Sequence, residues 1–267
     1  MRLKKFIMVI SALLLIFSLA GCGANQEQPN QEDPQAEAPQ QNANLTDGTY
    51  VAYSDADTES HGEAKIQLTL KDGKIADVTI EEIQDGSTGH AIKDLATYPH
   101  KPAVDGEAYF KENLTGLSTV EEIAAVDDFA GITHSSEKFK QAAQRAIVKA
   151  GAEKSGTYFD GTFMGYSDTT AENGFATAYV TIKNDAIESV TLQEWQPDKE
   201  KEGTFVLKDY ESYPLKEAKT ANKYFTKEFV DATSAEDIDA VDDFAGVTHS
   251  SANYKLAVKM ALEKAQQ

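Results

Sequence analysis

Cysteine is nearly absent from this chain of 267 residues, because Cys22 is the only one. A single cysteine excludes a disulfide within the chain. The sequence also lacks the HxxxH and CxxC spacings, which argues against a dedicated transition-metal site. The P-loop, Rossmann and Gly-x-Ser-x-Gly fingerprints are missing as well, and this disfavours kinase, dehydrogenase and hydrolase functions.

Basic residues are also scarce, since 25 Lys and Arg stand against 44 Asp and Glu, for a formal net charge of −19. An acidic surface repels nucleic acid and anionic membranes, so we expect no nucleic-acid partner. The hydrophobic content of 41% is nevertheless enough for packed cores, and the length suits two domains of ordinary size.

The N-terminus has the pattern of a secretory signal. Three basic residues precede an apolar run over residues 6–19, which is too short for a comfortable membrane span. The run ends in Leu19-Ala20-Gly21-Cys22, which looks like a bacterial lipobox; an ordinary cleavage site with an incidental cysteine is the alternative. We predict a signal peptide over residues 1–21, whose hydrophobic end also resembles leaders trimmed to peptide pheromones.

Lipidation of Cys22 would anchor the protein to the extracellular face of the bacterial cell membrane, because two acyl chains give stable membrane binding. The following residues are almost only Gln, Asn, Pro, Glu, Asp and Ala. Such a composition cannot bury apolar surface, so residues 22–45 are predicted to form a disordered tether. As a flexible coil it would span about 25 Å.

One stretch of the chain occurs twice. Residues 125–136 (AVDDFAGITHSS) return as residues 240–251 (AVDDFAGVTHSS), and only Ile132 and Val247 differ. Each copy leads into apolar residues at the spacing of an amphipathic helix. We therefore predict two tandem domains, over residues 46–154 and 155–267.

The pattern within each half predicts its fold class. Alternating apolar residues flank Lys71-Asp72-Gly73-Lys74 in the first half and Asn184-Asp185 in the second, which is typical of β-hairpins. Helical patterns follow, over residues 105–114 and 216–229. Strands followed by helices predict an α+β class, with two repeats that are each a small antiparallel sheet followed by helices. Capping boxes are predicted at Ser118-x-x-Glu121 and Thr233-x-x-Glu236.

The hydroxyl residues of the repeated run allow two interpretations. In the first, Gly131 forms a turn and Ser135 or Ser136 caps the helix. In the second, Thr133 and the serines surround a helix N-terminus, whose free N–H groups and positive dipole end suit a phosphate. The run is nearly identical in both copies whereas the following helices have diverged, which favours the second interpretation.

The run resembles the flavinylation motif of FMN-binding domains, roughly Asp-x-x-Ser/Thr-Gly-Ala-Thr/Ser-x-Ser/Thr. Such domains occur in the C subunit of the sodium-pumping NADH:quinone oxidoreductase, in its Rnf relatives and in surface lipoproteins of the PplA type. In that family the motif threonine carries FMN through a phosphoester bond, which an ApbE-type transferase makes from FAD.

The resemblance implies two covalent FMN groups, on Thr133 and Thr248. Ala130 and Ala245 stand where a hydroxyl residue is usual in the motif, and Ile132 and Val247 where alanine is usual. The other residues that the resemblance places at the cofactor are Asp127, Asp242, Gly131, Gly246, Ser135 and Ser250, with Ala130 and Ala245 in the same turns.

The function that the resemblance implies is electron transfer at the cell surface. A membrane quinone-linked donor would supply electrons, and extracellular ferric iron or soluble flavin would accept them. The protein would be an electron carrier and a substrate of the transferase rather than a turnover enzyme. The alternative is a non-redox surface lipoprotein that binds a peptide, a wall polymer or a phosphate-bearing ligand.

Several other residues have two interpretations each. His134 and His249 lie beside the threonines and could adjust a flavin's potential or simply occupy the turn. The acidic pairs, Asp127-Asp128 and Asp242-Asp243, could serve acid–base catalysis, cation-assisted flavin transfer or a solvated turn. Four aromatic residues could line a flavin or pack in the core: Trp195, Phe205, Tyr98 and Tyr213. We expect the remaining histidines at the surface: His61, His90 and His100.

Overall fold

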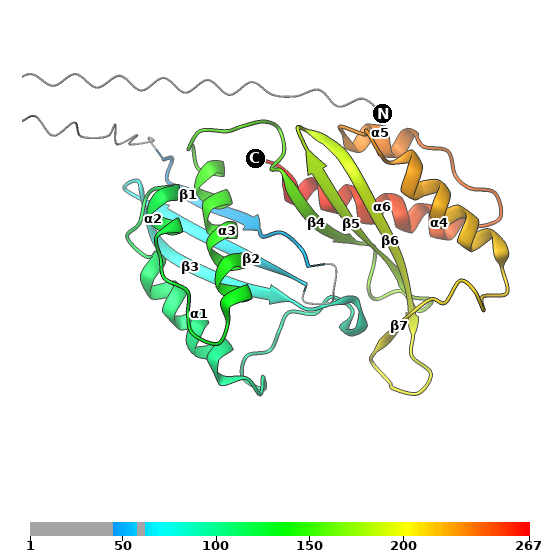
Figure 1. Ribbon diagram of the computed structural model, residues 1–267, viewed down its shortest axis with the longest axis horizontal. Coiled ribbons are helices and arrows are strands. Elements are labelled where there is room, and N and C mark those ends of the chain that lie inside the picture. Colours follow the sequence, from blue (N-terminus) through cyan, green and yellow to red (C-terminus); the bar gives the residue numbers. More distant parts are fainter. Residues whose placement is uncertain (1–44, 58–61) are drawn as a thin grey trace, which may run out of the picture. The chain divides into compact units, whose positions relative to one another are not determined.

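The computed structural model describes residues 45–57 and 62–267. The predicted signal peptide, the lipidation site Cys22, the tether up to residue 44 and His61 lie outside the described residues. The described chain runs twice through strands followed by helices (Figure 1), which confirms the α+β class and the two sheet-plus-helix repeats.

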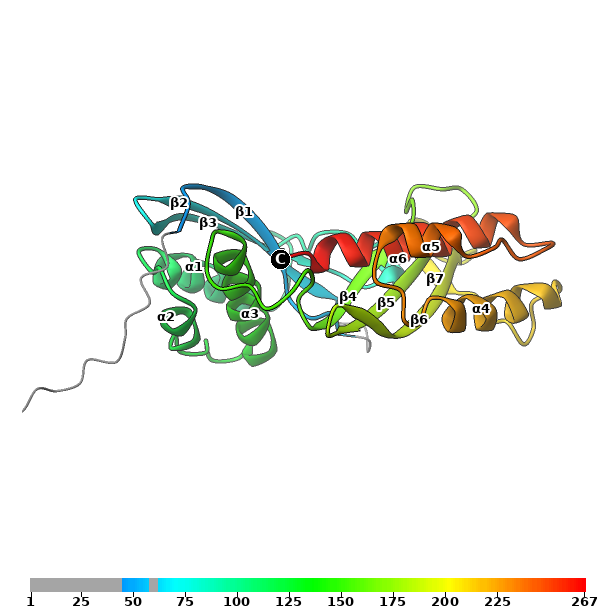
Figure 2. The ribbon, with the colours of Figure 1, turned by 90° about the horizontal axis from the view of Figure 1, so that it is seen from above.

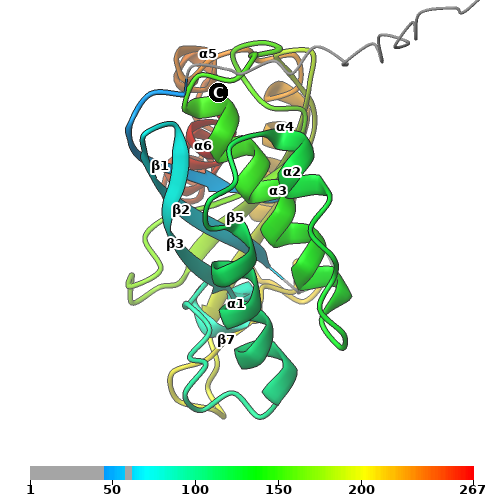
Figure 3. The same ribbon diagram turned by 90° about the vertical axis from the view of Figure 1, so that its left-hand side faces the viewer.

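The first repeat is an antiparallel sheet with strand order β1-β2-β3, followed by three helices. The helices lie on one face of the sheet (Figure 2). Figure 3 shows the same helices from another side, and α1 and α2 each contact α3. The elements are β1 (Gly48–Tyr53), β2 (Glu63–Lys71), β3 (Lys74–Ile83), the 3-10 helix η1 (Gly86–Thr88), α1 (Lys101–Leu114), α2 (Val120–Ala124) and α3 (Thr133–Lys149).

The second repeat has the same order with one additional short strand at the edge of its sheet, β4-β5-β6-β7. Its elements are β4 (Gly161–Tyr166), β5 (Phe175–Lys183), β6 (Ala186–Pro197), β7 (Phe205–Leu207), α4 (Lys216–Glu228), α5 (Ala235–Ala240) and α6 (Thr248–Ala265).

The predicted hairpins are confirmed, and their turns explain why these residues were recognisable. Asp72 and Gly73 have φ of 53° and 71°, and Asn184 and Asp185 have φ of 51° and 62°. Two successive left-handed residues match the right-handed twist of a strand pair, and Asn, Asp and Gly adopt that conformation most readily.

Each repeat has its own core between one sheet face and its helices. Fully buried aromatic residues contribute to both, with Phe110 in the first repeat and Phe163, Phe225 and Tyr254 in the second.

At one pair of contacting positions, the sizes of the two side chains differ between the repeats in opposite directions. A Cβ on Gly106 would lie 2.1 Å from the Ile132 δ-methyl, whereas the second repeat has Ala221 and the shorter Val247 at the aligned positions.

The opposite faces of the two sheets supply the contacts between the repeats. A small apolar cluster joins Ala56 and Ile83 to Met164 and Tyr179. Each terminal helix adds a buried cation. Arg145 of α3 bonds Asp55 at 2.6 Å and the Asp160 carbonyl at 3.0 Å, while Lys264 of α6 pairs with the buried Glu63.

The predicted helix starts need two corrections. The N-caps lie one residue further along than predicted, because Thr119 and Ser234 accept bonds from the N–H groups of Glu122 and Asp237. At Thr119 the Glu122 side chain completes a capping box. Helix α1 begins at Lys101, four residues before the predicted start. Pro102 explains this, since proline is well tolerated in the first turn of a helix. Within the described ranges, no helix combines the length and apolarity that a membrane crossing requires.

Candidate functional site

The repeated run forms a glycine turn and the first turn of the last helix in each repeat. Gly131 and Gly246 have φ of 91° and 88°, a left-handed conformation that glycine adopts without strain. Helices α3 and α6 begin at Thr133 and Thr248, and the preceding aliphatic N-cap residues make no side-chain capping bond. The N–H groups of both first turns therefore have no side-chain cap.

The first interpretation, in which Ser135 or Ser136 caps the helix, is wrong, because both residues lie inside the first turn of α3. Ser136 Oγ donates to the Ile132 carbonyl at 2.9 Å and accepts from the Phe129 N–H at 3.1 Å. Ser251 makes the same two bonds, at 3.0 and 3.2 Å, with Val247 and Phe244. These serines fix the turn that precedes the helix, which gives a structural reason for their presence in both copies.

The acidic pairs do not converge on one point. Asp128 pairs with Lys140 of α3 at 2.6 Å, and Asp243 pairs with Lys255 of α6 at 2.9 Å. One acid of each pair is therefore bound to a lysine of the helix that follows it. Asp127 and Asp242 are exposed. This arrangement does not resemble two carboxylates that share one substrate. No group of three or more His, Cys, Asp or Glu in the described part of the chain could hold a metal ion.

The other motif serine joins a polar network, which we call the Ser-Glu-Lys network. In the first repeat it comprises Ser135, Glu82 and Lys93. Ser135 Oγ donates to Glu82 Oε1, and Lys93 Nζ pairs with Glu82 Oε2. The Lys93 ammonium also lies 4.5 Å from the centre of the Tyr98 ring, within the range of a cation–π contact.

The second repeat contains the same network, formed by Ser250, Glu194 and Lys208. Ser250 Oγ donates to Glu194 Oε1 at 2.6 Å, and Lys208 Nζ donates to Glu194 Oε2 at 3.0 Å. Lys208 lies 4.6 Å from the centre of the Tyr213 ring. The same four side-chain types thus meet beside both motif turns.

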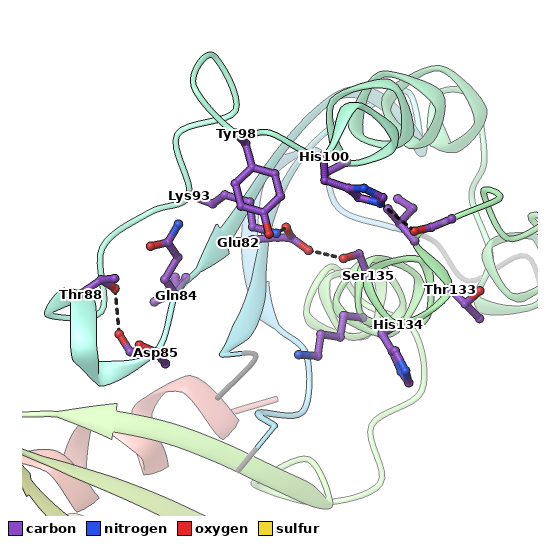
Figure 4. Close-up of a pocket in the computed structure, with 15 residues that line it drawn as sticks. Glu82, Gln84, Asp85, Thr88, Lys93, Tyr98, His100, Thr133, His134 and Ser135 are labelled. Carbon is purple, nitrogen blue, oxygen red and sulfur yellow. Dashed lines mark hydrogen bonds and ion pairs between the residues drawn. The ribbon is translucent and has the colours of Figure 1, made fainter. Parts of the chain in front are cut away.

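A pocket of about 660 Å³ adjoins the network of the first repeat. Ser135, Glu82, Lys93 and Tyr98 line it together with Gly131 and Thr133. Figure 4 shows Thr133 at one end, where the helix begins, and Thr88 at the other, with the lysine and tyrosine between them. The volume lies within the range of small-molecule and cofactor sites.

Two histidines stand at the same pocket. His100, predicted to be a surface residue, lines it and has Nε2 3.1 Å from the Gly131 carbonyl (Figure 4). Because a carbonyl only accepts, Nε2 carries the proton and donates. His134 also lines the pocket and is exposed.

The structure brings some of the predicted residues together and leaves others apart. Gly131, Thr133 and Ser135 share the pocket of the first repeat, but Asp127 and Ala130 are not among its lining residues. In the second repeat the aligned residues adopt the same backbone, with an exposed threonine and a serine bonded to a glutamate. The aligned residues are Gly246, Thr248, Ser250, Asp242 and Ala245.

The expectation of a surface position for His90 is wrong. His90 is 5% exposed, stacks on Tyr166 and has Nε2 2.7 Å from Thr177 Oγ1. Burial lowers the pKa of His90 to about 4. Of the four predicted aromatics, Tyr98 lines the pocket, whereas Trp195 and Phe205 pack around Phe175.

Sequence reasoning missed the glutamate and lysine of the network, although a signal was present. Residues 93–99 (KDLATYP) and 208–214 (KDYESYP) repeat the lysine, the aspartate and the Tyr-Pro pair. Glu82 and Glu194 also occupy aligned positions in the last part of β3 and β6. An alignment of the halves beyond the longest identical run would have selected these residues.

The residues around the pocket fit a ligand with a phosphate group and a polar ring. Uncapped N–H groups and an exposed hydroxyl stand at the helix start, where a phosphate is stabilised by the helix dipole. A lysine and a tyrosine lie further along the same pocket. The carboxylates of Glu82 and Asp85 line the same pocket, and that of Glu82 pairs with Lys93. The donors at the helix start are the groups that would hold the phosphate of an FMN attached through Thr133.

Comparisons with known proteins give little further guidance. No family model matches the chain, and no curated protein matches it. The chain is similar to the crystal structure of the CPE2226 protein from Clostridium perfringens, with 25% identity over 40% of this chain and 88% of that chain. The TM-score of 0.32 is too low for a conclusion about function or fold.

Proposed function

We propose that this protein is a lipid-anchored surface flavoprotein that carries two FMN groups, esterified to Thr133 and Thr248, and transfers electrons out of the membrane. The observation that carries the proposal is the exposed threonine at an uncapped helix start in both repeats. In the first repeat this threonine opens onto a pocket of about 660 Å³.

The protein's own groups suit attachment of a phosphate. The threonine hydroxyl would displace AMP from FAD at the FMN phosphorus, so that the Oγ–P bond forms, the pyrophosphate bond breaks and the hydroxyl proton leaves. An ApbE-type transferase would supply the catalytic groups for this step. The first-turn N–H groups and the helix dipole would then stabilise the phosphodiester charge.

Once bound, FMN supplies reversible two-electron chemistry, and the chain's residues position it. The left-handed glycine makes the turn that precedes the helix, and His100 holds this turn by donating to the Gly131 carbonyl. Electrons would arrive from a membrane quinone-linked donor and leave to ferric iron or soluble flavin. Anchoring through Cys22 would hold the protein at the extracellular face of the membrane.

Peptide mass spectrometry after coexpression with the flavin transferase tests this proposal. Both threonine peptides should gain the mass of FMN less water. Thr133→Ala and Thr248→Ala should each remove about half of the visible absorption, and the double variant should be colourless. Thr157→Ala is a matched control, because this exposed threonine lies outside both motifs. Unmodified peptides in a folded protein would sink the proposal and favour a non-redox ligand for the same helix ends.

A further inference from the structure

The ion pair beside each motif turn is held in the same way in both repeats. In addition to the side-chain contact, the Lys93 N–H donates to the Glu82 carbonyl at 2.8 Å, and the Lys208 N–H donates to the Glu194 carbonyl at 2.8 Å. Three separate segments therefore meet at each pair: a strand (β3 or β6), a segment further along the chain that carries the lysine, and the first turn of the last helix. In the second repeat the lysine directly follows β7.

These pairs are largely removed from water. The side chains of Lys93 and Glu82 are both 15% exposed, and those of Lys208 and Glu194 are 13% and 7% exposed. Removing two charges from water costs about as much as their attraction returns, so a buried ion pair is weak evidence for stability. A requirement of the site explains better why the pair is present twice.

The neighbours of the two pairs have diverged, which strengthens this argument. The positions aligned with Leu95 and Phe139 of the first repeat hold Tyr210 and Tyr254 in the second. Apolar side chains have thus been exchanged for polar ones directly beside the glutamate, whereas the serine, glutamate, lysine and tyrosine of the network are the same in both repeats.

The lysine has one donor to spare for a ligand. An ammonium group carries three N–H donors and no acceptor. For Lys93, Glu82 accepts one of them and the Tyr98 ring covers a second direction. Since Lys93 also lines the pocket, its third N–H is available to a ligand there.

We propose that Lys93 and Lys208 bind the redox-active ring of the flavin in each repeat, and that Glu82 and Glu194 act as positioning residues for them. The inference rests on the proposed function and names the ring-binding cation of that site. Ser135 and Ser250 connect each pair to the turn that carries the attachment threonine two residues earlier.

A cation at the ring favours the reduced flavin, because reduction by the quinol-linked donor adds electrons and therefore negative charge. Loss of the lysine charge should lower the midpoint potential. A tenfold change in the relative stability of the oxidised and reduced forms corresponds to about 30 mV for a two-electron couple. We expect a shift of at least this size.

The test uses the full chain, coexpressed with the flavin transferase and carrying Thr248→Ala, so that only the first repeat holds flavin. Spectroelectrochemical titration compares this parent with Lys93→Met and with Lys208→Met, the matched control in the repeat without flavin. Lys93→Met should lower the potential by about 30 mV or more. Lys208→Met should leave the potential unchanged. Lys93→Arg keeps the positive charge, so its potential should stay close to that of the parent. In a Thr133→Ala parent the two lysines should exchange roles.

Three results would overturn the inference. They are an unchanged potential in flavin-loaded Lys93→Met, an equal shift in the Lys208→Met control, and a folded Lys93→Met chain that no longer takes up flavin, which would place the lysine at the attachment step. If Lys93→Met does not fold, as judged by circular dichroism, Lys93→Gln provides the same comparison with a donor to Glu82 retained. A colourless parent instead defeats the proposed function itself.

Discussion

Beneath the Ser-Glu-Lys networks, the two repeats are built from different side chains. In the second repeat the Tyr210 hydroxyl donates to Glu194 Oε2 at 2.9 Å and lies 2.9 Å from the Tyr254 hydroxyl. The aligned residues of the first repeat, Leu95 and Phe139, have no hydroxyl; Leu95, Phe139 and Glu82 line a cavity of about 30 Å³.

This difference shows which part of the site tolerates change. The groups that face the motif turn are the same in both repeats, whereas the layer beneath them has changed from apolar to hydrogen-bonded. Burial raises the pKa of both Tyr210 and Tyr254, so they remain neutral near pH 7. The second glutamate therefore has more donors than the first, and the two sites need not have the same redox potential.

The repeats also contribute unequally to the contact between them. Only the first repeat places a histidine there: His90 lies on Tyr166, and its Nδ1 is 3.3 Å from the Gln84 carbonyl. The carbonyl accepts the Nδ1 proton, so Nε2 accepts the Thr177 hydroxyl and the ring is neutral. Protonation would remove that acceptor and leave a charge in a buried position.

The largest expected effect concerns acid stability. The folded pKa of His90 is about 4, below the ordinary value of 6.5, so the unfolded chain binds more protons between these values. The contribution of His90 to the free energy of unfolding is therefore fully present above about pH 6.5. It is lost as the pH falls toward 4, and the total loss is about 3 kcal/mol. Urea unfolding at pH 7.5 and 4.5 should show this loss.

His90→Gln isolates the contribution, because glutamine does not titrate and still offers an acceptor to Thr177. The variant should be less stable than the natural chain at pH 7.5 but should lose less stability on acidification. His100→Gln is the matched control, since His100 is an exposed histidine at the pocket. An equal acid loss in His90→Gln and in the natural chain would contradict the assignment.

A smaller effect on stability is expected at two contacting positions, where one repeat has a small and a large side chain and the other has two of intermediate size. Gly106→Ala would bring a Cβ within 2.1 Å of the Ile132 δ-methyl, and overpacking of this kind costs about 1–3 kcal/mol. The gain in helix propensity, about 1 kcal/mol, offsets part of the loss. Thermal unfolding should place the single variant below the natural chain.

The double variant Gly106→Ala/Ile132→Val copies the second repeat and supplies the control. It should recover the lost stability, because valine lacks the clashing methyl while alanine retains its helix propensity. A double variant that is no more stable than Gly106→Ala would contradict this explanation. The combination of Ala221 and Val247 in the second repeat would then not reflect matched packing of the two side chains.

The parts of the fold that the sequence predicts are those determined by neighbouring residues. The hairpin turns were predictable because Asp72-Gly73 and Asn184-Asp185 adopt left-handed conformations that few other residues favour. The helix starts were less predictable. Adjacent hydroxyl residues compete for each N-cap, and only the fold selects Thr119 over Ser118.

The candidate site was predictable only in part, for the same reason. Thr133 and Ser135 belong to one continuous run, so repetition made them visible. Glu82 and Lys93 meet that run from 53 residues away and from a separate loop, and periodicity carries no information about such contacts. His90 likewise lies in a segment whose composition is that of a surface loop. Its burial against Thr177 depends on how the second repeat packs against the first.

The smallest expected effect separates the two attachment sites. Glu217 of α4 lies near Gly246, with its Cγ 3.9 Å from the position of an added Cβ, whereas the first repeat has Pro102 beside Gly131. The side chain is exposed, so its repulsion of an incoming phosphate is worth about 0.2–1 kcal/mol. With limiting transferase, Thr133 should therefore be modified about 1.5- to 5-fold faster than Thr248.

A time course of peptide masses tests this difference. Glu217→Gln should bring the two rates together, and so should 1 M salt, where the screening length falls to about 3 Å. Glu228→Gln removes the same charge at the other end of α4 and should leave the ratio unchanged. If the ratio survives both Glu217→Gln and high salt, charge at the glycine turn does not distinguish the repeats, and the layer beneath the glutamates becomes the better explanation.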